Sequence, residues 1–247
     1  MNKEVIIKTD KLTKRFGNFV AVNEITFEVN KSEIFGFLGA NGAGKTTAMR
    51  MLTGLSIPSS GNATIVGFDV YKQRDEIKKN IGYMSQKFSL YEDLTVLENI
   101  SFYGGIYGLS DARIKAKSEE LIAQLGLQNE AKKLVASLPL GWKQKLAFSV
   151  AVIHEPKIVF LDEPTGGVDP VTRRQFWDLI YAAAEKGITL FVTTHYMDEA
   201  EYCNRISIMV DGKIEDLDTP ENLKKRYNAN TMDEVFYQLA RRAKRVE

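Results

Sequence analysis

Residues 39–46 read Gly-Ala-Asn-Gly-Ala-Gly-Lys-Thr and match the pattern G-x-x-x-x-G-K-[ST] at every fixed position. Glycines let the backbone turn so that several N–H groups face one anion, and a helix that follows adds the positive end of its dipole. In this pattern Lys45 reaches the β- and γ-phosphates, and the Thr46 hydroxyl binds Mg²⁺. The motif predicts binding of a nucleoside triphosphate. The nucleotide-binding residues expected here are Gly39, Ala40, Asn41, Gly42, Ala43, Gly44, Lys45, Thr46 and Thr47.

A second chemical motif is the apolar run 158–161, which ends in the two carboxylates Asp162 and Glu163. Beside a phosphate loop, Asp162 is expected to hold Mg²⁺ through water, and Glu163 to orient or deprotonate the attacking water. Kinases, GTPases, motors and transport ATPases share such loops. The sequence N-K-x-D, which selects guanine, is missing from the chain, and this disfavours a GTPase.

Two more polar residues follow apolar runs. His195 comes after residues 189–194, and Gln86 comes after the run that begins at residue 81. The carboxyl ends of parallel strands meet at one edge of a sheet, so both side chains should lie near the γ-phosphate. The Gln86 amide is expected to touch Mg²⁺ or the attacking water. By contrast, His154 stands at the end of an apolar helix before Pro156, and we interpret it as structural.

Strand-like and helix-like runs alternate along the chain, which predicts an α/β fold. Asp211-Gly212 is typical of a hairpin turn. The expected strands are residues 5–7, 19–29 with a turn at Asn23–Glu24, 34–38, 63–66, 81–84, 158–161, 189–193, 206–210 and 214–217. The expected helices are residues 46–55, 96–107, 112–125, 142–154 and the stretch 219–247.

Composition limits the remaining possibilities. The chain has 247 residues, with 33 basic and 32 acidic side chains, so its charge gives no reason to expect a nucleic-acid partner. The one cysteine, Cys203, excludes an intramolecular disulfide. A bilayer span needs about 20 apolar residues, and the longest useful apolar run, 146–153, is shorter. We therefore expect any membrane role to come through a partner.

Together these elements resemble the nucleotide-binding domain of ATP-binding-cassette (ABC) proteins over residues 4–240. The order matches: phosphate loop, Gln86, a helical stretch, the acidic strand end and His195. The resemblance implies a P-loop NTPase (RecA-like) core with an N-terminal antiparallel β subdomain and an inserted α-helical subdomain. It implies one domain, with residues 1–86 and 156–218 as the core, 87–155 as the helical part and 219–247 as C-terminal helices. ATP and Mg²⁺ are the implied ligands.

The resemblance also assigns roles that the residues alone do not. Phe16 sits where an aromatic ring stacks on adenine, and Asp169 where an aspartate acts across a dimer. Leu138 and Gly141 belong to the segment that caps the γ-phosphate of the opposite subunit. That segment usually reads L-S-G-G-Q, but here Pro139 and Leu140 replace the serine and the first glycine. It is therefore either a working variant, which we favour, or half of a composite site with a different ATPase subunit.

The resemblance further implies partners and a location. Two cassettes, identical or different, would pair head to tail, and an integral membrane permease would dock on Phe88, Tyr91 and Leu94 at the cytoplasmic face of the cell membrane. Residues 94–99 and 196–200 look most like type-two ABC exporters. The alternatives are a regulatory ATP-binding module with weak hydrolysis, and a cassette that acts on ribosomes or DNA, which the single chain and balanced charge disfavour.

Overall fold

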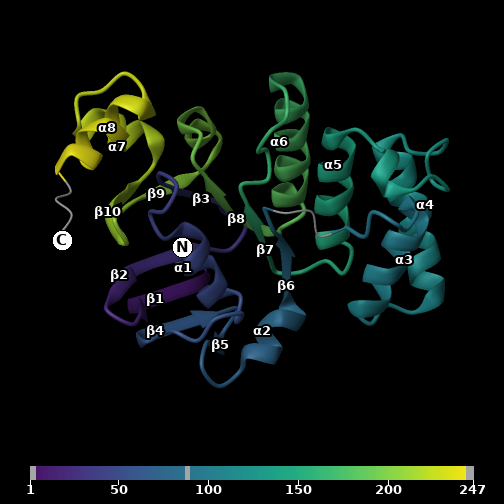
Figure 1. The fold of residues 1–247 in the computed structure, drawn as a ribbon, viewed down its shortest axis with the longest axis horizontal. Helices are drawn as coiled ribbons and strands as arrows, with labels where there is room; N and C mark the ends of the chain where they lie inside the picture. Colours follow the sequence, from purple (N-terminus) through teal and green to yellow (C-terminus); the bar gives the residue numbers. More distant parts are fainter. Residues whose placement is uncertain (1–3, 87–89, 243–247) are drawn as a thin grey trace.

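The computed structural model describes residues 4–86 and 90–242, except for the side chain of Arg242, and shows two β-sheets in this part of the chain (Figure 1). The larger sheet has the strand order β10-β9-β3-β8-β7-β6. All its neighbouring strands run parallel except β10, which forms the expected hairpin with β9. The strands are β3 (Ile34–Leu38), β6 (Ile81–Met84), β7 (Ile158–Asp162), β8 (Thr189–Thr194), β9 (Arg205–Val210) and β10 (Lys213–Asp218).

The smaller sheet is antiparallel, with the order β2-β1-β4-β5. Its strands are β1 (Val5–Phe16), β2 (Phe19–Asn30), β4 (Ser60–Ile65) and β5 (Phe68–Asp69). Two predictions were wrong here: β1 extends far beyond residue 7, and no turn divides β2 at Asn23–Glu24. Glu24 takes a positive φ of 51° and forms a bulge, and its N–H donates to Thr13 Oγ1 over 3.0 Å. Because this hydrogen bond gives the Glu24 N–H a partner at the bulge, β2 continues past Glu24 without a turn.

Five phenylalanines fill the space between the two sheets. The ring centroid of Phe191 in β8 lies 5.3 to 6.3 Å from those of Phe27, Phe35, Phe37 and Phe160. These side chains belong to one buried cluster that joins β2 of the smaller sheet to β3, β7 and β8. The N-terminal sheet is therefore fixed to one face of the strands that precede the candidate site.

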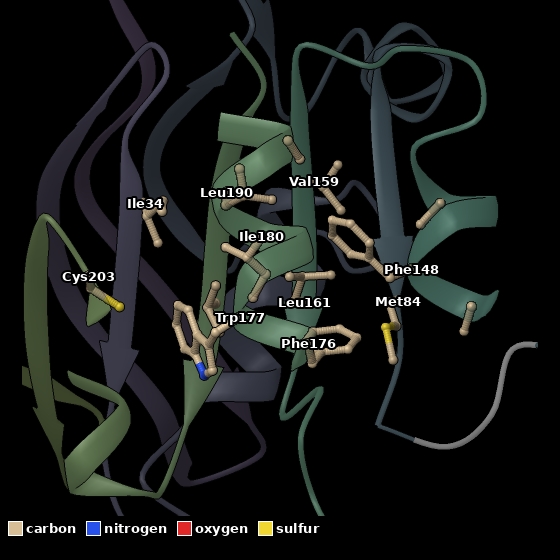
Figure 2. Close-up of a cluster of buried hydrophobic side chains, with 14 of the residues drawn as sticks. Ile34, Met84, Phe148, Val159, Leu161, Phe176, Trp177, Ile180, Leu190 and Cys203 are labelled. Atoms are coloured by element: carbon tan, nitrogen blue, oxygen red, sulfur yellow. The ribbon is translucent and has the colours of Figure 1, made fainter. Parts of the chain in front are cut away.

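The opposite face of the larger sheet packs on helices. Val159 and Leu161 alternate with Phe160 along β7 and point to this face, where Figure 2 shows them among Phe148 and Phe176. Phe148 belongs to α5 (Leu140–Ala151) and Phe176 to α6 (Pro170–Glu185). Helix α6 was not expected, although a capping aspartate followed by proline is a sequence signal for a helix start.

The other helices agree in part with the predictions. The expected helix after the phosphate loop ends at Leu52, three residues early, because Gly54 takes a left-handed φ of 72°. Helix α2 was not expected. The division of the chain into core, helical and C-terminal parts stays a prediction. The remaining helical segments are α1 (Lys45–Leu52), α2 (Arg74–Asn80), α3 (Val96–Ile106), α4 (Asp111–Leu125), η1 (Val135–Ser137), η2 (Met197–Tyr202), α7 (Pro220–Arg226) and α8 (Met232–Arg242).

Gly82 in β6 allows close approach of α5 to the sheet. A Cβ atom at Gly82 would lie 2.2 Å from the carbonyl oxygen of Ala151, the last residue of α5. His154 joins the same region, because its Nε2 lies 3.1 Å from the carbonyl oxygen of Ile81 and its ring stacks on Tyr107 with 3.6 Å between centroids. Burial lowers the pKa of His154. These contacts confirm its structural role.

Within the described ranges, every helix is too short or too polar to cross a bilayer.

The phenylalanine cluster predicts a large stability loss on truncation. Phe191→Ala should lower the free energy of unfolding by about 3–5 kcal/mol, because it removes a fully buried ring and leaves a cavity. Phe102→Ala is the control, since that ring is 40% exposed. Urea denaturation followed by circular dichroism measures both. Equal midpoints for the two variants would contradict the role of this cluster.

Candidate functional site

The register of the parallel strands brings their carboxyl ends to one edge of the larger sheet. Leu38 at the end of β3 pairs with Thr194 at the end of β8, and Thr193 pairs with Asp162 at the end of β7. The phosphate loop follows β3. The other candidate side chains follow β6, β7 and β8, and they are Gln86, Glu163 and His195.

The phosphate loop needs glycine at two positions. Gly42 and Gly44 take φ values of 83° and 105°, which residues with a Cβ rarely adopt. A Cβ at Gly44 would also lie 2.4 Å from the carbonyl oxygen of Ala21 in β2. Helix α1 begins directly after Gly44, and no side chain caps it. The N–H groups of its first turn therefore lack intrahelical acceptors and form a site for an anion.

Lys45 is buried at the start of α1, with 4% of its side chain exposed. Its Nζ donates to the carbonyl oxygens of Gly39 and Ala40 over 2.8 and 3.1 Å, and lies 3.4 Å from Glu163 Oε1. Burial lowers the pKa of Lys45, whereas the Glu163 carboxylate opposes this change. The ammonium group is thus held inside the loop, where it can exchange these partners for phosphate oxygens.

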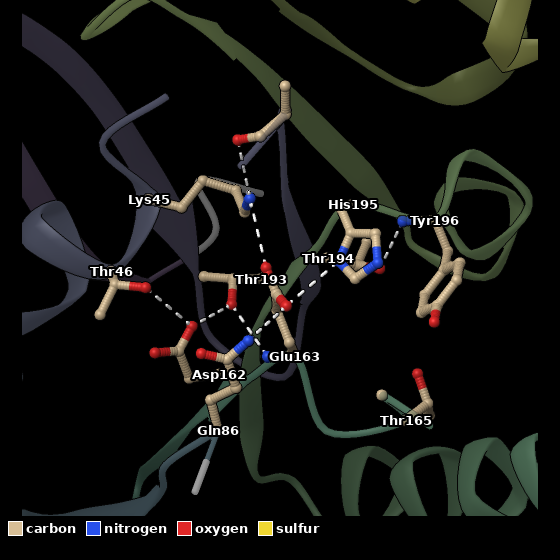
Figure 3. Close-up of polar contacts among 12 residues, drawn as sticks. Lys45, Thr46, Gln86, Asp162, Glu163, Thr165, Thr193, Thr194, His195 and Tyr196 are labelled. Carbon is tan, nitrogen blue, oxygen red and sulfur yellow. Dashed lines mark hydrogen bonds and ion pairs between the residues drawn. The ribbon is translucent and has the colours of Figure 1, made fainter. Parts of the chain in front are cut away.

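Asp162 faces the hydroxyl group of Thr46. Thr46 Oγ1 donates to Asp162 Oδ1 over 3.4 Å, and Thr193 Oγ1 donates to the same oxygen over 2.6 Å (Figure 3). Asp162 is 2% exposed. Mg²⁺ prefers oxygen ligands and keeps several waters, so one carboxylate, one hydroxyl and substrate phosphates form a suitable set. These residues fit that ion, although the described part of the chain holds no cluster of three or more acidic, histidine or cysteine ligands.

Glu163 is the centre of the polar contacts in Figure 3. Gln86 Nε2 donates to Glu163 Oε2 over 2.8 Å, and His195 Nδ1 lies 3.1 Å from the same oxygen. Glu163 has a left-handed φ of 49°, and its N–H donates to the carbonyl oxygen and to the hydroxyl of Thr193. The structure therefore brings together Gln86, Glu163 and His195, as their positions after apolar strands predicted.

A cleft of about 320 Å³ lies over the phosphate loop. Phe19, 65% exposed, lines this cleft, whereas Phe16, 56% exposed, is not among its lining residues. Sequence reasoning missed Phe19, because an aromatic residue at the start of an apolar run is usually read as core. Because it is exposed, Phe16 is not part of the hydrophobic core. The lining residues are Phe19, Ala21, Asn41, Gly42, Gly44, Lys45, Thr46, Thr47, Gln86 and Glu163.

The variant segment lies at the start of α5, outside that cleft. The Leu138 side chain is 6% exposed and belongs to the buried cluster, and its contact with the nucleotide of an opposite subunit stays a prediction. Leu140 is 38% exposed. Packing within this chain requires glycine at position 141, because a Cβ there would lie 2.3 Å from Thr172 Cγ2 in α6. Pro139 precedes α5 without a side-chain cap.

Asp169 caps α6. Its Oδ1 accepts the N–H groups of Val171 and Thr172, each over 3.0 Å, and its Oδ2 accepts the Thr172 hydroxyl over 2.5 Å. Hydrogen bonds from the Thr172 hydroxyl and N–H lower the pKa of Asp169. Like the variant segment, Asp169 is not among the residues that line the cleft. Its contacts inside the chain are those of a helix cap, and a role across a dimer stays a prediction.

Replacement of Lys45 tests the phosphate loop. Lys45→Ala should weaken ATP binding by about 10- to 100-fold, because the variant loses charged hydrogen bonds to phosphate. The control is Lys79→Ala, which removes only an exposed ion pair with Glu76. Isothermal titration calorimetry with Mg²⁺ present measures both dissociation constants. Unchanged affinity in Lys45→Ala would show that the nucleotide binds elsewhere.

Comparison with known proteins agrees with this geometry. Residues 22–166 match the family described as ABC transporter. The probable multidrug ABC transporter ATP-binding protein YbhF of Escherichia coli is 46% identical over 242 residues, which cover 96% of this chain and 42% of that protein. The chain thus spans about two-fifths of the length of that relative. The bacitracin transport ATP-binding protein BcrA of Bacillus licheniformis is 39% identical, over 90% of this chain and 72% of its own length.

A solved structure supports the fold. It is an ATP-binding cassette in a dimeric post-hydrolysis state with ADP and Pi, and it aligns with a TM-score of 0.77 at 25% identity over 86% of this chain and 98% of its own. The α/β fold with its phosphate-loop core is therefore confirmed. None of these matches favours the regulatory alternative. From the family match, the coverage of the bacitracin relative and the grouping of Lys45, Asp162 and Glu163, we conclude that this chain belongs to the ABC transporter family, as an ATP-binding cassette.

Proposed function

We propose that this chain binds and hydrolyses ATP and thereby drives an ABC exporter. The observation that carries the proposal is the grouping of Lys45, Asp162 and Glu163, with Gln86 and His195, at one edge of the sheet. A phosphate-binding cation, an oxygen ligand for a metal and a candidate general base are the groups that phosphoryl transfer to water requires. ATP is the substrate in this proposal.

Each side chain has a distinct role. The phosphate-loop N–H groups and Lys45 bind the phosphates, and Lys45 leaves Glu163 when it does so, because the same Nζ cannot keep both sets of partners at full strength. Glu163 then accepts a proton from the attacking water. Gln86 and His195, which both contact Glu163 Oε2, orient that carboxylate and the water. The aromatic rings of Phe16 and Phe19 are the candidates for stacking on adenine.

Thr46 and Asp162 are the residues that would hold Mg²⁺, and Gln86 stands beside them as a further candidate ligand. The ion would neutralise charge on the phosphates. Thr193 donates to Asp162 and so fixes the orientation of its carboxylate.

We further propose that two copies of the cassette, or this one and a different cassette, pair around ATP. Leu138, Gly141 and Asp169 do not line this chain's own cleft, which leaves the start of α5 free to face the nucleotide of a partner. The related solved cassette is described as a dimer with ADP and Pi. Helix α5 begins at Leu140 without a side-chain cap, and this helix start would offer N–H groups to that phosphate despite Pro139.

The membrane partner would be a permease at the cytoplasmic face of the cell membrane. Tyr91 and Phe102 are 47% and 40% exposed and meet edge-to-face, with 4.9 Å between ring centroids. With the half-buried Leu94 they offer an apolar contact for a permease helix. Phe88, the other residue expected there, lies outside the described residues. Export is the direction we propose, because the relatives are named for multidrug and bacitracin transport.

Replacing the candidate base tests hydrolysis and pairing together. Glu163→Gln should lower kcat by about 10²–10⁴-fold, because an amide cannot accept the proton, while ATP binding is kept. With ATP and Mg²⁺ the variant should elute as a dimer in gel filtration, since the bridging phosphate is no longer removed. Glu76→Gln, at an exposed ion pair, is the control. A monomeric Glu163→Gln variant that binds ATP would contradict the pairing.

The variant segment gives a separate prediction. If the helix start at Leu140 is sufficient, Pro139→Ser combined with Leu140→Gly should change kcat by less than about threefold. The double variant gains a hydroxyl group but also places a second glycine in the first turn of α5. Steady-state ATPase assays at saturating ATP measure the effect. A sharp rise in turnover would instead indicate that the natural segment impairs hydrolysis.

A further inference from the structure

A carboxylate with no role assigned so far is fully buried beside the site. Glu199 lies in η2 and has no exposed surface. Its Oε1 accepts a hydrogen bond from the Thr165 hydroxyl, and its Oε2 accepts one from the Thr194 hydroxyl over 2.6 Å. Arg173 Nε lies 3.6 Å from Oε1 and supplies the opposite charge. Both carboxylate oxygens are thus used inside the protein.

The two threonines adjoin the reacting groups: Thr165 lies in the loop that carries Glu163, and Thr194 ends β8. Thr165 stands two residues after Glu163, and Thr194 directly precedes His195. Figure 3 shows Thr194 beside His195, and Thr165 in the chain that leaves Glu163. Glu199 therefore joins the end of β8 to the loop after β7 through one carboxylate. It touches neither Glu163 nor the cleft, so any effect on hydrolysis passes through these loops.

Arg173 reinforces the same junction from α6. Its guanidinium carbon lies 4.1 Å from the ring centroid of Tyr196, and its Nη1 lies 3.2 Å from Asp198 Oδ2. The N–H of Tyr196 donates to Thr194 Oγ1 over 3.0 Å, so this hydroxyl both accepts from Tyr196 and donates to Glu199. These contacts fix Thr194 and Tyr196, the two residues on either side of His195.

The backbone of Glu163 explains why such a support is needed. Its left-handed φ of 49° is strained for a residue with a Cβ, and strained turns persist only where the surroundings determine them. The N–H of Glu163 is held by Thr193, and its carbonyl oxygen accepts from the N–H of Gly166. Thr165 lies between these two anchors, and its side chain is the one that Glu199 holds.

We propose that Glu199 is a positioning residue for ATP hydrolysis, which keeps Glu163 and His195 in register with each other. This inference rests on the proposed function. It goes beyond that function because it gives the buried Glu199 a role of its own. That role is to keep His195 Nδ1 3.1 Å from Glu163 Oε2. The phosphate loop makes no contact with Glu199, so binding of ATP does not depend on it.

The test separates turnover from binding. Glu199→Ala should lower kcat by about 10- to 100-fold and change the ATP dissociation constant by less than about threefold. Glu199→Gln should restore most of the activity, because its amide can accept from one threonine hydroxyl and donate to the other. The control on the same segment is Glu201→Ala, which removes an exposed ion pair with Lys224 and should leave kcat unchanged.

Milder variants keep the proposal testable if Glu199→Ala does not fold. Thr165→Val removes one hydrogen bond to Glu199, and Thr194→Val removes one to Glu199 and one from the N–H of Tyr196. Each should lower kcat by about 2- to 10-fold. In the Glu163→Gln background, Thr165→Val should have no further effect on the residual rate, because the base that it positions is already gone. A general loss of folded protein would instead lower the rate by the same factor in the wild-type and the Glu163→Gln backgrounds. That result would overturn the proposal.

The outcomes also separate this inference from the proposed function. If the wild-type chain binds and hydrolyses ATP while Glu199→Ala matches it in kcat, the positioning role is wrong and the function stands. If the wild-type chain shows neither binding nor hydrolysis with ATP and Mg²⁺, the proposed function itself fails, and the positioning role fails with it.

Discussion

The candidate site depends on the register in which β3, β8, β7 and β6 pair. These strands end level with one another, so each loop that leaves the sheet meets the loops of its neighbours. A shift of one residue would turn alternate side chains to the other face and separate Asp162 from Thr46. The hydrogen bond from Thr193 to Asp162 joins two strands at the point where this register matters most. The phenylalanine cluster and the helix layer hold the two faces of the same strands.

Charge balance inside the site follows from that register. Lys45 and Glu163 are each almost fully buried, and a buried charge without a partner would be strongly destabilising. Each therefore neutralises the other, with help from the carbonyl oxygens of Gly39 and Ala40 around the ammonium group. A triphosphate that enters the cleft meets a cation that already faces the loop, and little of the chain has to rearrange. Lys45 exchanges its partners for phosphate oxygens, whereas Asp162 and Glu163 are already held by Thr193, Gln86 and His195 before substrate arrives.

The sequence predicted the parts of this structure that depend on local chemistry. The phosphate loop requires glycines in fixed positions, and the parallel strands are continuous apolar runs, so both could be located from residue types. Helix α2 and the bulge at Glu24 could not, because they depend on contacts with other segments. Arg74 at the start of α2 donates to the carbonyl oxygen of Gly54, and the N–H of Glu24 donates to Thr13. Phe19 and Glu199 were missed for opposite reasons: an aromatic residue in a strand resembles core, and an acid in a polar stretch resembles surface. Leu138 came from the family resemblance, and only the packing shows that its side chain is buried.

The contact between Gly82 and the end of α5 restricts how this chain can vary. The carbonyl oxygen of Ala151 occupies the position where a methyl group at residue 82 would lie, although the two residues are far apart in the sequence. Any larger residue at 82 requires a compensating shift of the helix, and Gln86 is only four residues further along the chain. Libraries that randomise β6 alone would therefore enrich glycine at this position, whereas joint variation of the helix end would tolerate other residues.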